Sequence, residues 1–145
     1  MARTSELSAR LLAVVDALPI EPGMRVLEIG GAPGAAAREV AARIGPDGHV
    51  VVLDRSARGI ELTRRRCSEE ILAGTLSTVC VAIENFILED VESRFDLAFA
   101  CRVGALDGRH PQLRERAIDR IRAALRQDAP LFVDTGEPLR RVDLA

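Results

Sequence analysis

The segment from Val26 to Gly34 constrains the fold of this chain more than any other feature. It reads Val-Leu-Glu-Ile-Gly-Gly-Ala-Pro-Gly, an apolar strand that contains an acid and continues into a glycine-rich turn. Glycine tolerates dihedral angles that other residues avoid, and it lets the backbone approach a ligand closely. The segment therefore predicts a buried strand whose carboxyl end meets a small polar ligand.

Strands and helices alternate along the rest of the chain. Apolar runs predict strands at residues 24–29, 49–54, 78–83, 95–101 and 131–134, and helical spacing predicts helices at 5–18, 36–44, 56–72 and 111–126. The continuous apolar run at 50–53 suits a strand that is covered on both faces. We therefore expect an α/β fold, a doubly wound and mainly parallel sheet of strand order 3-2-1-4-5 with helices on both faces.

The length and composition restrict the class of protein. The 145 residues fit a single domain, 1–145, with an N-terminal helix inside 1–20 and a tail at 136–145. A net charge of -2 provides no general attraction to nucleic acid or to an anionic membrane. Trp and Tyr are absent and only four Phe are present, which argues against a surface that stacks single-stranded bases.

Several kinds of chemistry are excluded by missing residues. Lysine is absent, so no lysine nucleophile or Schiff base can form within the chain. The three cysteines form no CxxC pair, so we expect neither a disulfide framework nor a metal site. The opening residues contain no apolar core of a signal peptide, and no apolar run reaches membrane-spanning length. We therefore expect a cytoplasmic protein that does not contact a membrane.

The predicted ligand site contains a second acid. Ligands of doubly wound sheets bind outside the carboxyl ends of the strands, where the strand order reverses, which here is between the first and fourth strands. Asp54 ends the second strand, 24 positions after Gly30. An acid at about this distance accepts hydrogen bonds from ribose hydroxyls in dinucleotide-binding proteins. The alternative interpretation of Asp54 is a helix-cap or loop carboxylate.

Two classes of cofactor fit a glycine turn followed by a ribose-binding acid. Against the nicotinamide pattern G-x-G-x-x-G/A, the chain reads Gly30-x-Ala32-x-x-Ala35, so the middle glycine that admits the pyrophosphate is missing. Glu28 would also lie close to that anion. A carboxylate at this position is better matched to a cation, such as the α-ammonium group of S-adenosylmethionine. A nicotinamide-binding domain (NAD as ligand) stays as the less favoured alternative.

The glycine turn and the second strand together resemble a known family. The segments VLEIGGAPG and VVVLDRS are similar to motifs I and II of the class I S-adenosylmethionine-dependent methyltransferases. The family pattern acid-x-Gly-x-Gly-x-Gly corresponds to Glu28, Gly30, Ala32 and Gly34, so Ala32 replaces the middle glycine. The resemblance covers roughly residues 22 to 135 in element order. It implies a minimal Rossmann-like methyltransferase (EC 2.1.1.-) that uses S-adenosyl-L-methionine.

The resemblance also implies roles for individual residues. Glu28 anchors the amino acid part of the cofactor, Asp54 holds the ribose, and Glu84 after the third strand contacts the adenine amino group. A solvated loop acid is the alternative interpretation of Glu84. Cys101, Arg102 and Val103 line the methyl-donor end. The expected cofactor-binding residues are Glu28, Gly30, Gly31, Ala32, Pro33, Gly34, Asp54, Arg55, Ile83, Glu84, Asn85, Cys101 and Arg102.

The acceptor side is less well defined. Asp107 and His110 are the ordinary bases in the loop after the fourth strand, with Arg102 as a further candidate for a catalytic role. Asp107-Gly108 is also a turn signal, and His110 precedes a helix start. The chain lacks the Asp/Asn-Pro-Pro-aromatic segment, the Pro-Cys nucleophile and the lysines of nucleic-acid methyltransferases. A small-molecule acceptor or a protein side chain is therefore expected, not a nucleic acid.

The end of the chain leads to a prediction about the sheet edge. Most relatives continue into a two-stranded antiparallel addition, and residues 136–145 are too short for it, so we expect most of that addition to be missing. Because an unpaired edge invites another strand, this tail or the second subunit of a homodimer should cover the fifth strand. No lid domain is expected. A non-catalytic module that binds S-adenosylmethionine or S-adenosylhomocysteine is therefore the alternative to an enzyme.

Overall fold

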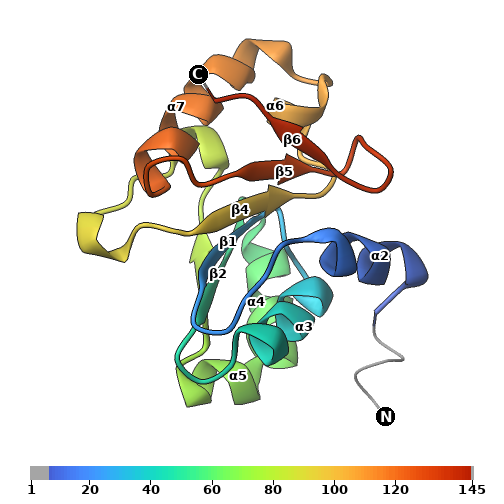
Figure 1. Ribbon diagram of the computed structural model, residues 1–145, viewed down its shortest axis with the longest axis vertical. Helices are drawn as coiled ribbons and strands as arrows, with labels where there is room; N and C mark the ends of the chain where they lie inside the picture. Colours follow the sequence, from blue (N-terminus) through green and yellow to red (C-terminus); the bar gives the residue numbers. More distant parts are fainter. Residues whose placement is uncertain (1–6, 145) are drawn as a thin grey trace.

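A computed structural model describes residues 7–144 of the chain. A single sheet of six strands has the order β3-β2-β1-β4-β5-β6 (Figure 1). The first five strands run parallel and β6 pairs antiparallel with β5, which confirms the mainly parallel sheet and the order 3-2-1-4-5. The strands are β1 (Arg25–Ile29), β2 (His49–Asp54), β3 (Leu76–Cys80), β4 (Leu97–Ala100), β5 (Leu131–Val133) and β6 (Arg140–Val142).

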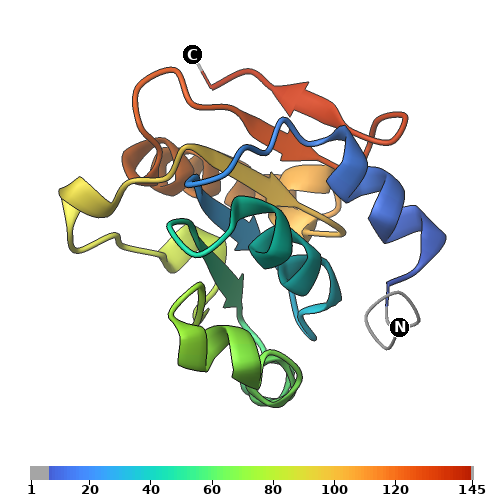
Figure 2. The same ribbon diagram turned by 60° about the horizontal axis from the view of Figure 1, so that its bottom comes forward.

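Helices cover both faces of this sheet, as the doubly wound prediction requires (Figures 1 and 2). They are α2 (Ala9–Ala17), α3 (Ala35–Ile44), α4 (Ala57–Arg66), α5 (Ser68–Ala73), α6 (Gly104–Asp107) and α7 (Arg114–Ala124). Short 3-10 turns are η1 (Ile83–Asn85), η2 (Val91–Ser93) and η3 (Pro111–Leu113). Among residues 7–144, no helix has the length and apolar character needed to cross a lipid bilayer.

Local capping explains where two of the helices begin and end. The Ser8 hydroxyl accepts a hydrogen bond from the Leu11 N–H at 3.2 Å and starts α2, and the first residues of the expected 5–18 helix lie outside the described residues. The Ser56 hydroxyl accepts from the Gly59 N–H at 2.9 Å and starts α4. The expected continuous helix to residue 72 is wrong, because Cys67 leaves the helical conformation and separates α4 from α5.

Other boundaries differ from the sequence prediction by a few residues. The third strand is Leu76–Cys80 and not 78–83, and Ile83 belongs to the turn η1, where its side chain is buried against the core. The fourth strand is shorter than 95–101, although Phe95 still forms an isolated bridge with Leu125. An apolar run marks burial and does not by itself mark the residues that form the ladder.

The two faces of the sheet pack against separate hydrophobic clusters. Leu27, Ile29 and Leu53 point into the cluster that includes α7, whereas Val26, Val50 and Val52 point into the cluster that includes α2 and α3. Side chains of a strand alternate between its faces, so both sets in β1 and β2 must be apolar. Glu28 is the exception in β1, since it is an acid at a buried position.

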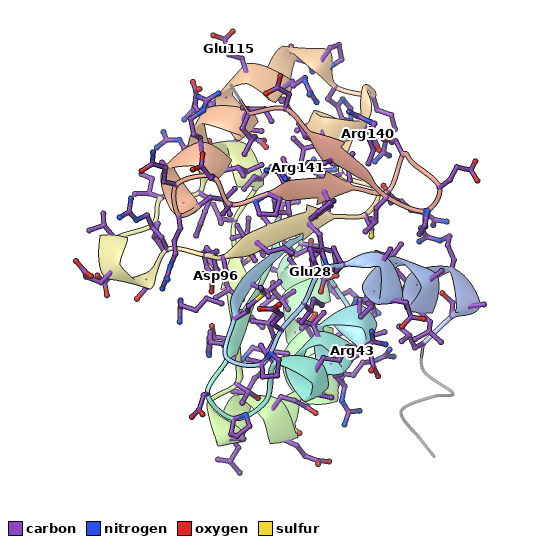
Figure 3. The ribbon with its side chains drawn as sticks, in the orientation of Figure 1. Glu28, Arg43, Asp96, Glu115, Arg140 and Arg141 are labelled. Atoms are coloured by element: carbon purple, nitrogen blue, oxygen red, sulfur yellow. The ribbon has the colours of Figure 1, made fainter. Side chains whose placement is uncertain are left out.

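The C-terminal tail covers the edge of β5. Val133 pairs with Arg140 and Leu131 with Val142 in the β5–β6 ladder, so the tail, as one of the two expected alternatives, protects this edge. Figure 3 shows Arg140 and Arg141 on this outer strand. The Arg122 guanidinium of α7 donates a hydrogen bond from Nε to the Leu144 carbonyl at 2.8 Å, which holds the tail against the domain. The homodimer stays a prediction.

Candidate functional site

Two neighbouring cavities lie at the carboxyl ends of the parallel strands, where the strand order reverses between β1 and β4. The first cavity has a volume of about 220 Å³ and lies over the ends of β2 and β3. The second has a volume of about 250 Å³ and lies beside α2 and the start of α3. Gly30 after β1 and Arg102 after β4 line both cavities, so the two spaces meet at these residues.

Most of the expected site residues line these cavities. The first cavity is lined by Gly30, Asp54, Arg55, Ile83, Glu84 and Arg102 from that set, and also by His110. The second is lined by Glu28, Gly30, Gly31, Ala32, Pro33, Cys101 and Arg102. Gly34, Asn85 and Asp107 line neither cavity.

Glu28 is the most unusual residue of the site. Its side chain is buried with 4% exposure, and its Oε1 atom has no hydrogen-bond partner among residues 7–144. In the view of Figure 3, Glu28 is labelled near the centre of the molecule. Burial, and secondarily the negative charge of Asp54, raises the pKa of Glu28 to about 8. The carboxyl group is therefore largely protonated at neutral pH and can ionise against a cation that enters the second cavity.

The turn after β1 uses glycine for a steric reason. A Cβ atom on Gly31 would lie 2.6 Å from the Glu28 Cδ, so a larger residue there would displace this carboxyl group. Gly30 has a φ of 69°, and a Cβ atom there would lie 2.8 Å from the Val103 Cγ2. Gly34 serves packing, because its own Cβ would lie 2.8 Å from the Cys67 Sγ of the neighbouring helix pair.

The N-terminus of α3 opens into the second cavity. Gly34 is the N-cap residue and provides no side chain to the first turn, and Ala35 and Ala36 line the cavity. The first N–H groups of a helix have no partner within the helix and favour an anion. This cavity therefore presents a buried acid and a helix N-terminus together, which matches the ammonium and carboxylate groups of an amino acid.

Asp54 accepts hydrogen bonds from two loop N–H groups and remains open to a ligand, whereas the cap of α4 is Ser56. The Asp54 Oδ2 accepts a hydrogen bond from the Ala32 N–H at 3.2 Å, and its Oδ1 accepts from the Ser56 N–H at 2.9 Å. These bonds join the end of β2 to the glycine turn and orient the carboxylate at the first cavity. Each carboxylate oxygen has a further lone pair, so the same group can accept hydrogen bonds from two ligand hydroxyls.

The opposite wall of the first cavity comes from η1. Ile83 and Glu84 line the cavity, and Ile83 is buried with 4% exposure. The Arg116 Nε of α7 donates a hydrogen bond to the Glu84 carbonyl at 2.8 Å and fixes this turn. Asn85, expected to flank the same ligand group, lies outside the lining of the cavity.

The segment after β4 is held in an unusual conformation. Arg102 has a φ of 56°, which is rare for a residue with a side chain. Its N–H donates to both carboxylate oxygens of Asp134 at 3.2 Å, and its carbonyl accepts a hydrogen bond from the Arg109 Nη2 at 2.7 Å. Cys101 beside it is half-buried, and burial, followed by Glu28, raises the pKa of its thiol to about 12. This thiol stays protonated and is a poor nucleophile.

The two base candidates differ in their surroundings. Asp107 pairs with the Arg109 guanidinium at 2.9 Å, and the hydrogen bond from Arg109 holds the pKa of Asp107 below its usual value. This carboxylate therefore accepts a proton poorly. His110 lines the first cavity, and its ring lies against Gly104. Of the two, His110 is the one placed to contact a ligand.

Two residues that shape the site were not among those expected from the sequence. Asp134 fixes the backbone of Arg102, and Arg10 of α2 forms an ion pair with Asp134 at 3.3 Å and lines the second cavity. Asp134 directly follows β5, the neighbour of β4, so its position at the same sheet edge was a usable signal. Nothing in the sequence placed α2 at this edge, where both views show it (Figures 1 and 2).

Comparisons with known proteins show the family of the chain. Residues 26–128 match the family model described as "Methyltransferase domain". The chain is 33% identical over 90 residues to a probable cobalt-precorrin-6B C(15)-methyltransferase (decarboxylating) of Thermoplasma acidophilum, over 62% of this chain and 43% of the relative. The chain thus spans less than half the length of this curated relative.

Solved structures share the fold. A methyltransferase from Aquifex aeolicus, described as S-adenosylmethionine dependent, superposes with a TM-score of 0.69 at 17% identity, over 92% of this chain and 71% of the other. The [4+2]-cyclase SpnF superposes with a TM-score of 0.68 at 22% identity, over 85% and 42%. At these identities the likeness establishes the arrangement of the sheet and helices, which serves more than one chemistry.

Proposed function

Because this chain belongs to the methyltransferase domain family, we propose that it binds S-adenosylmethionine across the two cavities and transfers the methyl group to a small-molecule acceptor. The cofactor supplies an electrophilic methyl group on a sulfonium. The residues of the chain bind it, orient it and exclude water from it. The cytoplasmic location expected from the sequence stays a prediction.

The buried, unpaired carboxyl of Glu28 carries this proposal. An acid at this depth destabilises the protein when it ionises without a partner. The pKa of Glu28 in the free protein is about 8. An ammonium group in the second cavity would supply the missing partner and would lower this pKa, so that Glu28 ionises at neutral pH when the ligand is bound. The N-terminus of α3 in the same cavity would receive the α-carboxylate of the same amino acid. This arrangement suits the methionine part of S-adenosylmethionine, whereas a dinucleotide pyrophosphate at the same N-terminus would leave Glu28 without a cationic partner.

The first cavity suits the adenosine part. The free lone pairs of Asp54 would accept hydrogen bonds from the ribose hydroxyls, and Ile83 would provide an apolar surface for the base. Glu84 lies on the same wall and would accept a hydrogen bond from the adenine amino group. Gly30 lines both cavities and would bring bare backbone beside the cofactor.

A binding module without catalysis is the second candidate, and the state of the candidate bases favours it. Asp107 is tied to Arg109, so His110 is the remaining one of the two ordinary bases expected from the sequence. An acceptor that is already a good nucleophile needs no base, and transfer would then depend on positioning alone.

Calorimetry with S-adenosylmethionine, S-adenosylhomocysteine and NAD tests the proposed ligand. Asp54→Ala should weaken the binding of both adenosyl ligands by about 1–3 kcal/mol, the scale for hydrogen bonds to a charged group. Asp47→Ala, an exposed acid in the turn before β2, is the matched control and should bind like the wild type. Binding of NAD in place of the adenosyl ligands would refute the proposal.

Transfer of a labelled methyl group from S-adenosylmethionine to a fractionated metabolite extract then tests catalysis. We expect label in a small-molecule fraction that depends on the protein. Tight binding without transfer to any fraction would favour the binding module.

A further inference from the structure

The backbone of Arg102 is fixed on both sides at a cost in conformational energy. The Asp134 carboxylate accepts a hydrogen bond from the Arg102 N–H at 3.2 Å, and the Arg109 Nη2 donates a hydrogen bond to the Arg102 carbonyl at 2.7 Å. These contacts hold a φ of 56°, a left-handed conformation that glycine adopts far more readily than arginine. Strained residues of this kind persist where surrounding contacts over-determine them, and they cluster at ligand sites.

The side chain of Arg102 has no such partner. Among residues 7–144, its guanidinium forms no hydrogen bond and no ion pair, in contrast to Arg109, which pairs with Asp107. Arg102 lines both cavities and therefore lies where they meet. The fold holds this residue in place while leaving its five N–H donors available to a ligand.

The charges around the junction of the cavities indicate the sign of that ligand. The second cavity is lined by Arg10 and Arg102, and its one acid, Glu28, has a pKa of about 8. In the second cavity Arg10 is paired with Asp134, which leaves Arg102 as the lining cation without an ion pair among residues 7–144. The first cavity adds Arg55 and Arg109 and the acids Asp54 and Glu84. A sulfonium brought to the junction would add a second positive charge. An anion beside Arg102 would offset this repulsion.

The carboxylate of the cofactor is one candidate for that anion, and a different position suits it better. The N-terminus of α3 opens into the second cavity beside Ala35 and Ala36, on the same side as Glu28. These N–H groups would receive a carboxylate whose ammonium pairs with Glu28. Arg102 also lines the first cavity, so the residue lies at the boundary of the space that the amino acid part would fill.

We propose that Arg102 binds a carboxylate of the methyl acceptor, so that the substrate of this protein is an organic anion. This inference rests on the proposed function and adds the chemical class of the acceptor. The planar guanidinium recognises a carboxylate through two parallel hydrogen bonds. Arg102 would thereby position the acceptor at the meeting point of the two cavities and balance the charge of the sulfonium.

The test uses simple carboxylates as probes and their neutral amides as controls. Acetate and acetamide, and benzoate and benzamide, are titrated at constant ionic strength into protein saturated with S-adenosylhomocysteine, so that the site of the cofactor carboxylate is filled. The wild type should bind each carboxylate at least about tenfold more tightly than its amide, because hydrogen bonds to charged groups contribute on this scale. Equal affinity for carboxylate and amide would overturn the proposal.

Three variants locate the anion. Arg102→Gln should abolish the preference for carboxylates, and Arg102→Gly provides a second variant whose backbone accepts the left-handed conformation, so that a failure to fold does not end the test. Arg64→Gln, at an exposed arginine of α4, is the matched control and should keep the preference. A carboxylate preference that survives in both Arg102 variants would place the anion elsewhere and refute the proposal.

Affinities for the cofactor separate the two sources of a carboxylate. S-adenosylhomocysteine is compared with 5′-methylthioadenosine, which lacks the amino acid part. If Arg102→Gln lowers the affinity for S-adenosylhomocysteine about tenfold more than the affinity for 5′-methylthioadenosine, Arg102 binds the cofactor carboxylate and the inference is wrong. A wild-type protein that binds no adenosyl ligand would refute the proposed function itself, whereas binding without a carboxylate preference would refute the Arg102 proposal alone.

Discussion

Replacing Glu28 with glutamine should change how the stability of this protein depends on pH. Burial raises the pKa of Glu28 from 4.5 to about 8, so between these values the folded protein holds a proton that the unfolded chain releases. The free energy of unfolding therefore decreases as the pH rises through this window. Each pH unit contributes about 1.4 kcal/mol, so the window of roughly 3.5 units corresponds to about 5 kcal/mol.

Glutamine has nearly the same shape as a protonated glutamic acid and does not ionise. Below pH 4.5 the variant and the wild type should therefore have similar free energies of unfolding. Above pH 8 the Glu28→Gln variant should be more stable by a few kcal/mol, because the wild type then contains an ionised and unpaired buried acid. The variant gains stability in the free protein and loses the group proposed to bind the cofactor.

Urea unfolding at pH 5, 7 and 9, at constant ionic strength, measures this difference. All other titrating groups are common to the two proteins, so the change of the difference with pH reports Glu28 alone. Glu69→Gln, at an exposed acid of α5, is the matched control and should differ from the wild type by the same small amount at every pH. If the difference in free energy of unfolding between Glu28→Gln and the wild type stays constant from pH 5 to pH 9, the raised pKa of a buried, partnerless Glu28 is refuted.

Three further predictions concern the same site. Binding of S-adenosylmethionine at pH 7 should release roughly one proton, since Glu28 ionises on binding; calorimetry in two buffers of different ionisation enthalpy measures it, and the absence of release would contradict the ammonium–Glu28 pair. Gly31→Ala should lower stability by about 1–3 kcal/mol and weaken cofactor binding, because the new Cβ would lie 2.6 Å from the Glu28 Cδ; unchanged urea midpoint and affinity would show that the turn adapts. Arg102→Gly should raise the melting temperature, because a φ of 56° costs a residue with a side chain about 1 kcal/mol and glycine avoids this cost. A lower melting temperature would mean that the arginine side chain stabilises the fold.

The strand order and the sheet edge of the candidate site were predicted from local patterns in the sequence. Alternating strands and helices with apolar runs admit few topologies, because crossovers between parallel strands are right-handed. The order 3-2-1-4-5 and the edge that holds Glu28 and Asp54 were therefore predictable, and the structure confirms the order. Boundaries were less predictable, as the break at Cys67 and the position of Ile83 in η1 show, because tertiary packing decides which apolar residues leave a helix or a strand.

The sequence by itself determined the class of fold, the glycine turn and the two acids at the carboxyl edge, since these depend on residues close together in the chain. Only the tertiary structure decided the environment of those residues. The burial that raises the pKa of Glu28 comes from elements packed around β1, and the Arg10–Asp134 pair joins residues 124 positions apart. The support of Arg102 by Asp134 likewise spans 32 positions. Desolvation, charge pairing and a fixed left-handed backbone are properties of packed neighbours, and neighbours of this kind are brought together by the fold and not by adjacency in the sequence.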